Sequence, residues 1–170
     1  LRKACGVDAS AFGREAFDTI NRQTQGSTTA HRTKELVKKL SQTWDRQRKE
    51  DSGAAKHVGT RVVISGAGPV GLRAAVGATM MGMHVTVLEK REVFSRVNIL
   101  TLWQQTADDL MAFGAKAFYP KFSNMTDVLH LGTREIQMVL MKNALLMGVE
   151  FSYGAELVSL QAPPAGAGGL

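Results

Sequence analysis

The stretch Val62-Val-Ile-Ser-Gly-Ala-Gly-Pro-Val-Gly-Leu-Arg-Ala-Ala75 decides the fold of this chain. It joins a short apolar, β-branched run to a glycine-rich turn and then to an alanine-rich segment. An apolar run before such a turn predicts a buried parallel strand, and the segment after the turn predicts a helix. A second strand is expected over His84–Glu89. Residues 61–89 therefore predict a strand–helix–strand crossover, the unit from which parallel sheets are built.

The glycine spacing of the turn, Gly-x-Gly-x-x-Gly, gives each glycine a separate task. Gly66 permits the turn, Gly68 lets a pyrophosphate approach the backbone, and Gly71 lets the helix pack closely on the strand. Pro69 costs nothing in the first helical turn, where free N–H groups attract phosphates. Glu89 follows at the spacing and strand position expected of a ribose ligand. The pattern predicts a dinucleotide site, the alternative being a glycine turn that binds no nucleotide.

The residues after the second strand bear on which dinucleotide this site binds. Glu89 would repel a 2′-phosphate, which disfavours NADP at this site and leaves NAD and FAD open. Lys90, Arg91, Arg96 and Asn98 follow within ten residues. Such a cluster can cover an adenine ring and neutralise phosphates, whereas the alternative is a solvated basic loop.

Charge and composition bound the remaining possibilities. Residues 1–59 hold 12 of the 21 Lys and Arg residues but 7 of the 15 Asp and Glu residues. A basic segment can attract an acidic partner, although interleaved charges also suit a solvated helical face. No uninterrupted apolar run is long enough for a membrane span. The single cysteine excludes an internal disulfide and favours a reducing compartment, and the four histidines show no metal-ligand spacing.

Hydrophobic periodicity predicts the remaining elements. Helices are expected around residues 12–20, from a Thr33 cap to about residue 50, over residues 98–113, and from Thr133 to a stop at Gly148. Strands are expected at residues 149–153 and 156–160, a polar loop at residues 90–96, and irregular structure over residues 114–131.

The glycine turn resembles that of FAD-dependent monooxygenases of the aromatic-hydroxylase type. Further runs are similar to the monooxygenase domain of the MICAL family, and the similarity extends over about residues 36–160. These runs are Glu89-Lys-Arg91, Phe94-Ser-Arg96, Asn98, Leu102-Trp103, Asp109-Leu110, Phe113-Gly-Ala-Lys116, Phe118-Tyr119 and Leu145-Leu-Met-Gly-Val-Glu150.

The resemblance implies a function and a set of cofactor contacts. MICAL proteins are NADPH-dependent flavoenzymes that oxidise methionines of actin filaments, which implies a cytoplasmic, cytoskeleton-associated protein that does not bind nucleic acid. The helix from Thr133 resembles a cofactor-facing helix, with Arg134 and Gln137 in its first turns, although Arg134 is equally an ordinary residue of a first turn. No catalytic residue and no metal ligand is assigned. The FAD contacts map onto Gly66, Gly68, Pro69, Val70, Gly71, Glu89, Lys90, Arg91, Arg96 and Asn98.

The resemblance also implies how the chain is organised. We expect an α/β, Rossmann-like FAD-binding fold of the aromatic-hydroxylase type that is incomplete and preceded by an α-helical segment. The predicted parts are a basic helical segment over residues 1–59, a partial FAD/NAD(P)-binding domain over residues 60–161, and a low-complexity loop or truncated end over residues 162–170. The second FAD signature of such enzymes, a Gly-Asp pair, would lie further downstream. The chain alone is therefore expected to bind FAD weakly and not to turn over.

Two other functions remain open on the sequence. One is a non-catalytic nucleotide-binding or actin-interaction module whose basic helix docks on an acidic partner. The other is an NAD-dependent dehydrogenase domain.

Overall fold

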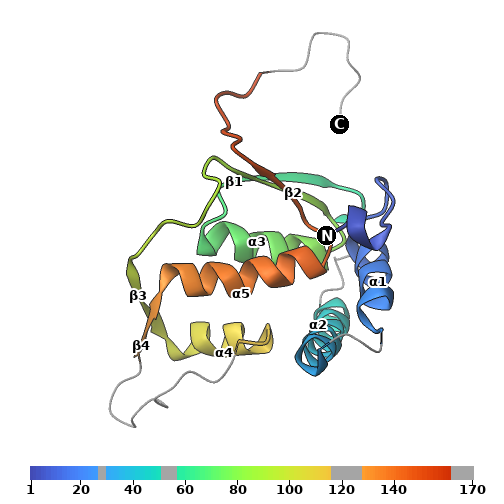
Figure 1. Cartoon of the computed structure of the whole chain (residues 1–170), viewed down its shortest axis with the longest axis horizontal. Coiled ribbons are helices and arrows are strands. Elements are labelled where there is room, and N and C mark those ends of the chain that lie inside the picture. Colours follow the sequence, from blue (N-terminus) through green and yellow to red (C-terminus); the bar gives the residue numbers. More distant parts are fainter. Residues whose placement is uncertain (27–29, 51–56, 116–127, 162–170) are drawn as a thin grey trace.

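The computed structural model describes residues 1–26, 30–50, 57–115 and 128–161. Its centre is a parallel sheet of three strands in the order β1-β2-β5, formed by β1 (Arg61–Ser65), β2 (His84–Glu89) and β5 (Glu150–Tyr153). Helix α3 (Pro69–Met80) connects β1 to β2, and α5 (Thr133–Leu146) leads into β5. Both helices lie side by side on one face of the sheet, below it in Figure 1. The expected crossover around the glycine turn is confirmed.

Alternation of side chains in β2 explains this layering. Val85 and Val87 are buried, whereas the intervening Thr86 is only partly covered. Successive strand side chains point to opposite faces, so the two valines lie on one face. Both belong to the core cluster that also contains Ala75 and Val76 of α3. Small side chains on α3 let the helix approach the sheet closely.

The basic N-terminal segment packs on this core through two helices, α1 (Gly13–Thr24) and α2 (His31–Glu50), and is preceded by a short 3-10 turn, η1 (Lys3–Cys5). The two helices lie together at one end of the sheet (Figure 1). Their apolar side chains join the same core cluster as those of α3 and α5. These side chains are Phe17, Ile20, Val37, Leu40 and Trp44.

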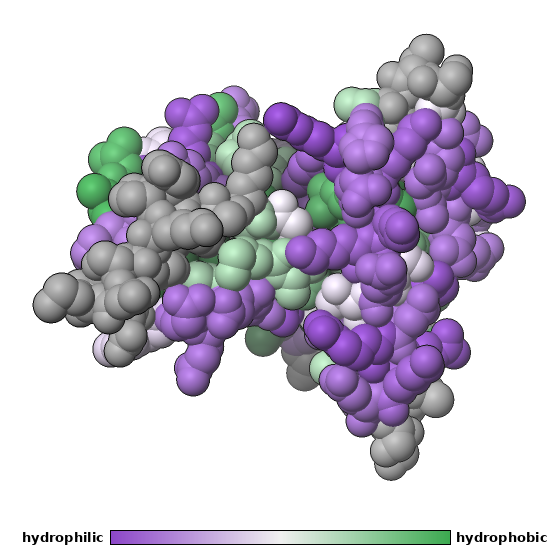
Figure 2. Space-filling model, turned by 90° about the horizontal axis from the view of Figure 1, so that it is seen from below, coloured by the Kyte–Doolittle hydropathy of each residue, from purple (hydrophilic) through white to green (hydrophobic). Residues whose placement is uncertain are grey.

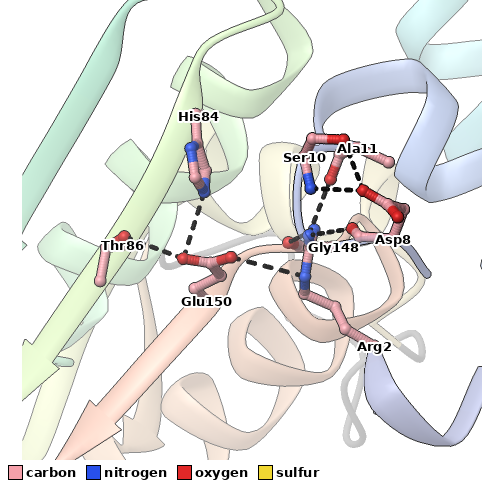
Figure 3. Close-up of polar contacts among 8 residues, drawn as sticks. All are labelled: Arg2, Asp8, Ser10, Ala11, His84, Thr86, Gly148 and Glu150. Atoms are coloured by element: carbon pink, nitrogen blue, oxygen red, sulfur yellow. Dashed lines mark hydrogen bonds and ion pairs between the residues drawn. The ribbon is translucent and has the colours of Figure 1, made fainter. Parts of the chain in front are cut away.

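Arg2 fastens the chain start to β5, as Figure 3 shows. Its guanidinium donates to the carbonyl oxygens of Gly148 at 3.0 Å, Asp8 at 3.0 Å and Ala11 at 2.7 Å, and it lies 3.6 Å from the Glu150 carboxylate. These contacts lie at the amino end of β5, the end of the sheet away from the glycine turn.

His84, at the amino end of β2, completes this cluster. Its Nε2 lies 3.1 Å from the Glu150 carboxylate, and its ring stacks on Phe12 with centroids 4.8 Å apart. The first residues of the chain are thereby tied to two strands at once.

The expected helix over residues 98–113 is wrong at its start. Residues Ile99–Trp103 form strand β3, which pairs antiparallel with β4 (Val128–Gly132), and helix α4 (Gln104–Ala112) begins only afterwards. Periodicity alone favoured a helix here, but the pairing partner lies 29 residues away at Thr101 and His130, in a stretch expected to be irregular. Long-range pairing of this kind overrides local propensity.

Two smaller expectations also differ. Residues 156–160 do not form a strand, and Val158 and Leu160 are exposed, because no neighbouring strand pairs with them in the described part of the chain. Helix α2 begins at His31, so Thr33 lies inside the helix rather than capping it. The expected strand at residues 149–153 and the helix from Thr133 are confirmed. The expected loop over residues 162–170 lies outside the described residues.

Candidate functional site

A cleft of about 670 Å³ lies at the carboxyl ends of the parallel strands, beside the start of α3. In open parallel sheets this is the edge at which ligands bind. The wall is formed by the glycine turn, the loop after β2, the segment after β5 and one side chain of α5. It includes Gly66, Gly68, Val70, Gly71, Glu89, Lys90, Arg91, Arg96, Gln137, Ala155 and Glu156.

Glycine stands at each of the three positions of the turn for a different structural reason. Gly66 has φ +103°, a left-handed backbone conformation that side chains disfavour. A Cβ on Gly71 would collide with the Gly66 carbonyl oxygen and would lie 3.3 Å from Ile64 Cγ2. A Cβ on Gly68 would meet nothing within 4 Å, and the Gly68 backbone (φ −70°, ψ 169°) has a conformation that any residue can adopt. The chain itself therefore does not require a glycine at position 68, and the open space lies where a ligand would approach.

Gly68 is also the N-cap of α3, with Pro69 in the first turn. Its carbonyl oxygen accepts the first helical hydrogen bond, from the Leu72 amide at 2.9 Å. The start of a 12-residue helix presents free N–H groups and the positive end of its dipole. This geometry favours a phosphate at the cleft.

Glu89 is a buried carboxylate at the end of β2, 7% exposed. One oxygen accepts the backbone N–H of Ala67 at 2.8 Å and the other that of Arg91 at 3.0 Å. Burial by itself raises the pKa of Glu89. These two hydrogen bonds and the nearby charges of Arg91 and Arg96 outweigh burial, so the pKa lies below its ordinary value. Glu89 is ionised at neutral pH, and each oxygen keeps a lone pair for a hydroxyl donor.

Of the other residues predicted to contact a cofactor, some lie on the cleft wall and some do not. Val70 is on the wall and is 84% exposed, and Arg91 and Arg96 are exposed at the rim. Lys90 is on the wall as well, and its ammonium pairs with Glu156 at 3.1 Å. Pro69 and Asn98 are not part of the cleft wall.

Asn98 instead supports the start of α5. Its backbone carbonyl accepts the Thr133 amide at 2.8 Å and the Thr133 hydroxyl at 2.9 Å. A cofactor contact by the Asn98 side chain remains a prediction.

Of the two residues of α5 named as possible cofactor contacts, one lies on the cleft wall. Gln137 is on the wall and 4% exposed, whereas Arg134 is exposed and lies off the wall. Residues that sequence reasoning missed are Ala67, whose backbone is held by side chains on both sides, and Glu156, the partner of Lys90. Neither carries a motif signal, because Ala67 acts through its backbone and Glu156 was expected to begin a strand that does not form.

These residues fit a dinucleotide. A phosphate fits the open space at Gly68 over the α3 start, and ribose hydroxyls fit the ionised Glu89. The arginines at the rim supply charge that phosphates require. Within the described ranges no three or more His, Cys, Asp or Glu residues gather as a metal site. None of the described helices has the length and apolar character that crossing a membrane demands.

Solved structures of other proteins share this fold. The tetrameric form of 2-methyl-3-hydroxypyridine-5-carboxylic acid oxygenase is 22% identical, with a TM-score of 0.51 over 61% of this chain and 33% of that chain. FqzB is 16% identical, with a TM-score of 0.51 over 62% of this chain and 32% of that chain. The fold and the glycine turn define the chain as a partial Rossmann-like FAD-binding fold of the aromatic-hydroxylase type.

The curated relatives narrow this class. The chain is 48% identical over 106 residues to [F-actin]-monooxygenase MICAL1 of Bos taurus and 44% identical over 105 residues to [F-actin]-monooxygenase MICAL3 of Homo sapiens. Over this segment the chain is similar to the F-actin monooxygenases of the MICAL family. The matches cover 62% of this chain but only 10% and 5% of those relatives. A scan against protein-family models found no match.

Proposed function

We propose that the chain binds FAD in the cleft and forms the first cofactor-binding part of an NADPH-dependent monooxygenase that oxidises methionines of actin filaments. The observation that carries the proposal is the open space at Gly68, over the start of α3 and next to the ionised Glu89. A chain that only had to fold would not need glycine at this position.

The residues of the chain bind and orient the cofactor. The amides at the start of α3 would hold the pyrophosphate, and Glu89 would accept the ribose hydroxyls. Arg91 and Arg96 would lie along the adenine and flavin sides of the ligand. When bound, the flavin ring supplies the redox chemistry, and the protein supplies position and electrostatics.

Gly68→Val tests the FAD site. The added side chain should occupy the space that the pyrophosphate needs, so the FAD dissociation constant, measured by quenching of flavin fluorescence, should rise by more than about tenfold. Gly77→Ala, on the same helix but off the cleft wall, is the matched control and should leave FAD affinity unchanged. Equal FAD affinity in wild type and Gly68→Val would refute the assignment.

The actin part of the proposal is supported by the similarity to F-actin monooxygenases and by the charge of α2. Its outward side chains are mainly cationic, and Figure 2 shows hydrophilic residues crowded over the side of the molecule that carries α1 and α2. A basic surface of this kind is suited to binding an acidic protein partner. If that partner is the actin filament, the protein would act at the cytoskeleton, in the cytoplasm. The exposed cations of α2 are Arg32, Lys38, Lys39, Arg46, Arg48 and Lys49.

The same basic surface favours a second candidate function, a non-catalytic module that binds actin without oxidising it. The natural full-length gene product should be incubated with NADPH and F-actin, followed by mass spectrometry of actin peptides. Addition of one oxygen to actin methionines supports the monooxygenase. Cosedimentation with F-actin without that modification supports the binding module instead.

A further inference from the structure

Gln137 is the most deeply buried polar side chain on the cleft wall, 4% exposed in the second turn of α5. Its Nε2 donates to the backbone carbonyl oxygen of Ala67 at 2.8 Å. This bond joins two elements 70 residues apart in the sequence, the helix before β5 and the glycine turn after β1.

The Ala67 backbone is held from both sides. Its N–H donates to Glu89 Oε2 at 2.8 Å, and its carbonyl oxygen accepts from Gln137 at 2.8 Å. Ala67 is fully buried, so water does not compete for either bond. Two successive peptide planes of the turn are therefore fixed by side chains from two other elements.

Fixing the Ala67 carbonyl also fixes the next amide. The peptide between Ala67 and Gly68 is planar and trans, so its N–H points opposite to its C=O. Gln137 holds the carbonyl on the α5 side, which turns the Gly68 N–H away from Gln137. Gly68 is the N-cap of α3, and its amide belongs to the group of donors that a phosphate would meet.

We propose that Gln137 is a positioning residue for the cofactor: its amide aims the Gly68 N–H at the pyrophosphate before the ligand arrives. The proposal rests on the proposed FAD site. Pre-aligned donors bind more tightly, because no ordering cost remains to be met on binding. The Gln137 Oε1 atom has no hydrogen-bond partner among the described residues, so the Ala67 bond is the interaction that the buried amide makes within them.

Two near-isosteric variants separate positioning from a structural role. Gln137→Met removes the donor but keeps the volume, and FAD affinity should fall about tenfold, the scale of one lost hydrogen bond. The ligand-free protein should melt a few degrees lower, because the buried Ala67 carbonyl loses its partner, so FAD affinities are compared well below the melting transition. A fall in melting temperature with unchanged FAD affinity would overturn the proposal.

Gln137→Glu adds a pH-dependent readout. Its ionised carboxylate faces the Ala67 carbonyl, so FAD should bind weakly at neutral pH. Protonation restores an O–H donor, so affinity relative to wild type should recover as the pH is lowered. The charged and titratable groups that line the same cleft are Glu89, Lys90, Arg91, Arg96 and Glu156, and these five residues are the same in wild type and in Gln137→Glu.

Gln42→Glu, on the exposed face of α2, is the charge-matched control and should bind FAD as wild type does at every pH. A Gln137→Glu affinity that stays parallel to wild type across pH would overturn the positioning role. If the wild-type chain does not bind FAD, the proposed function fails together with the inference. If wild type binds FAD and Gln137→Met binds it equally well, only the inference fails.

Discussion

Gly71→Ala is predicted to destabilise the chain whether or not a ligand is present. The new Cβ would collide with the Gly66 carbonyl oxygen and press on Ile64 Cγ2 at 3.3 Å. The neighbouring backbone cannot move aside easily, because the Gly66 amide donates to the Leu88 carbonyl oxygen at 2.7 Å and the Ala67 amide is held by Glu89.

The expected loss follows from two opposing terms. Forcing an extra methyl into a packed site costs about 1–3 kcal/mol. Replacing glycine inside a helix regains up to about 1 kcal/mol, and less in the first turn, where Gly71 lies. A net loss of about 1–2 kcal/mol should lower the melting temperature by roughly 2–8 °C in a chain of this size.

The assay is thermal unfolding followed by circular dichroism, with two alanine variants as controls. Gly68→Ala meets no atom within 4 Å and should leave stability within about 0.5 kcal/mol of wild type. Gly77→Ala would place its Cβ 3.3 Å from Nη1 of Arg73, whose guanidinium is held by Asp109, so the gain from replacing a helical glycine should be partly offset and stability should stay close to that of wild type. A Gly71→Ala protein as stable as Gly68→Ala would refute the close packing of turn and helix.

Two further predictions concern the two ends of the sheet. Arg2→Met should lower the free energy of unfolding by about 2 kcal/mol in urea titrations, because three backbone carbonyls lose a charged donor; an unchanged midpoint would contradict the anchoring role. Glu89 has a lowered pKa, so its ionised form stabilises the fold above pH 4.5, and this contribution is lost as the pH falls through the folded-state value. The stability gap between wild type and Glu89→Gln should therefore narrow below pH 4.5, and a gap independent of pH would speak against it.

The crossover around the glycine turn could be predicted because its signals are local. The apolar run, the glycine spacing and Glu89 all lie within residues 61–89, and each constrains the backbone directly. Strand β3 could not be predicted in this way, since residues Ile99–Trp103 become a strand only by pairing with residues Val128–Gly132. The strand expected over residues 156–160 does not form, because no strand in the described part of the chain pairs with these residues.

The site shows the same division between local and distant signals. The three glycines and Glu89 could be predicted as site residues from their residue type and spacing. The Ala67 contact did not, because an alanine contributes only its backbone and the partner Gln137 lies on a helix 70 residues away. The resemblance placed Gln137 on a cofactor-facing helix, but only the folded chain shows what its amide holds.

Glycines outside the turn tie the N-terminal segment to the rest of the core. A Cβ on Gly148, at the end of α5, would lie 2.7 Å from the Ala16 side chain of α1, and one on Gly114 would collide with Leu36 of α2. Both glycines have positive φ, so the backbone already favours glycine there, and the helices of the segment pack against the bare backbone. The segment thus covers α5 and the end of α4 as part of one core. Helix α5 also carries Gln137, so weaker packing of the N-terminal helices against α5 would change the position of a residue on the cleft wall.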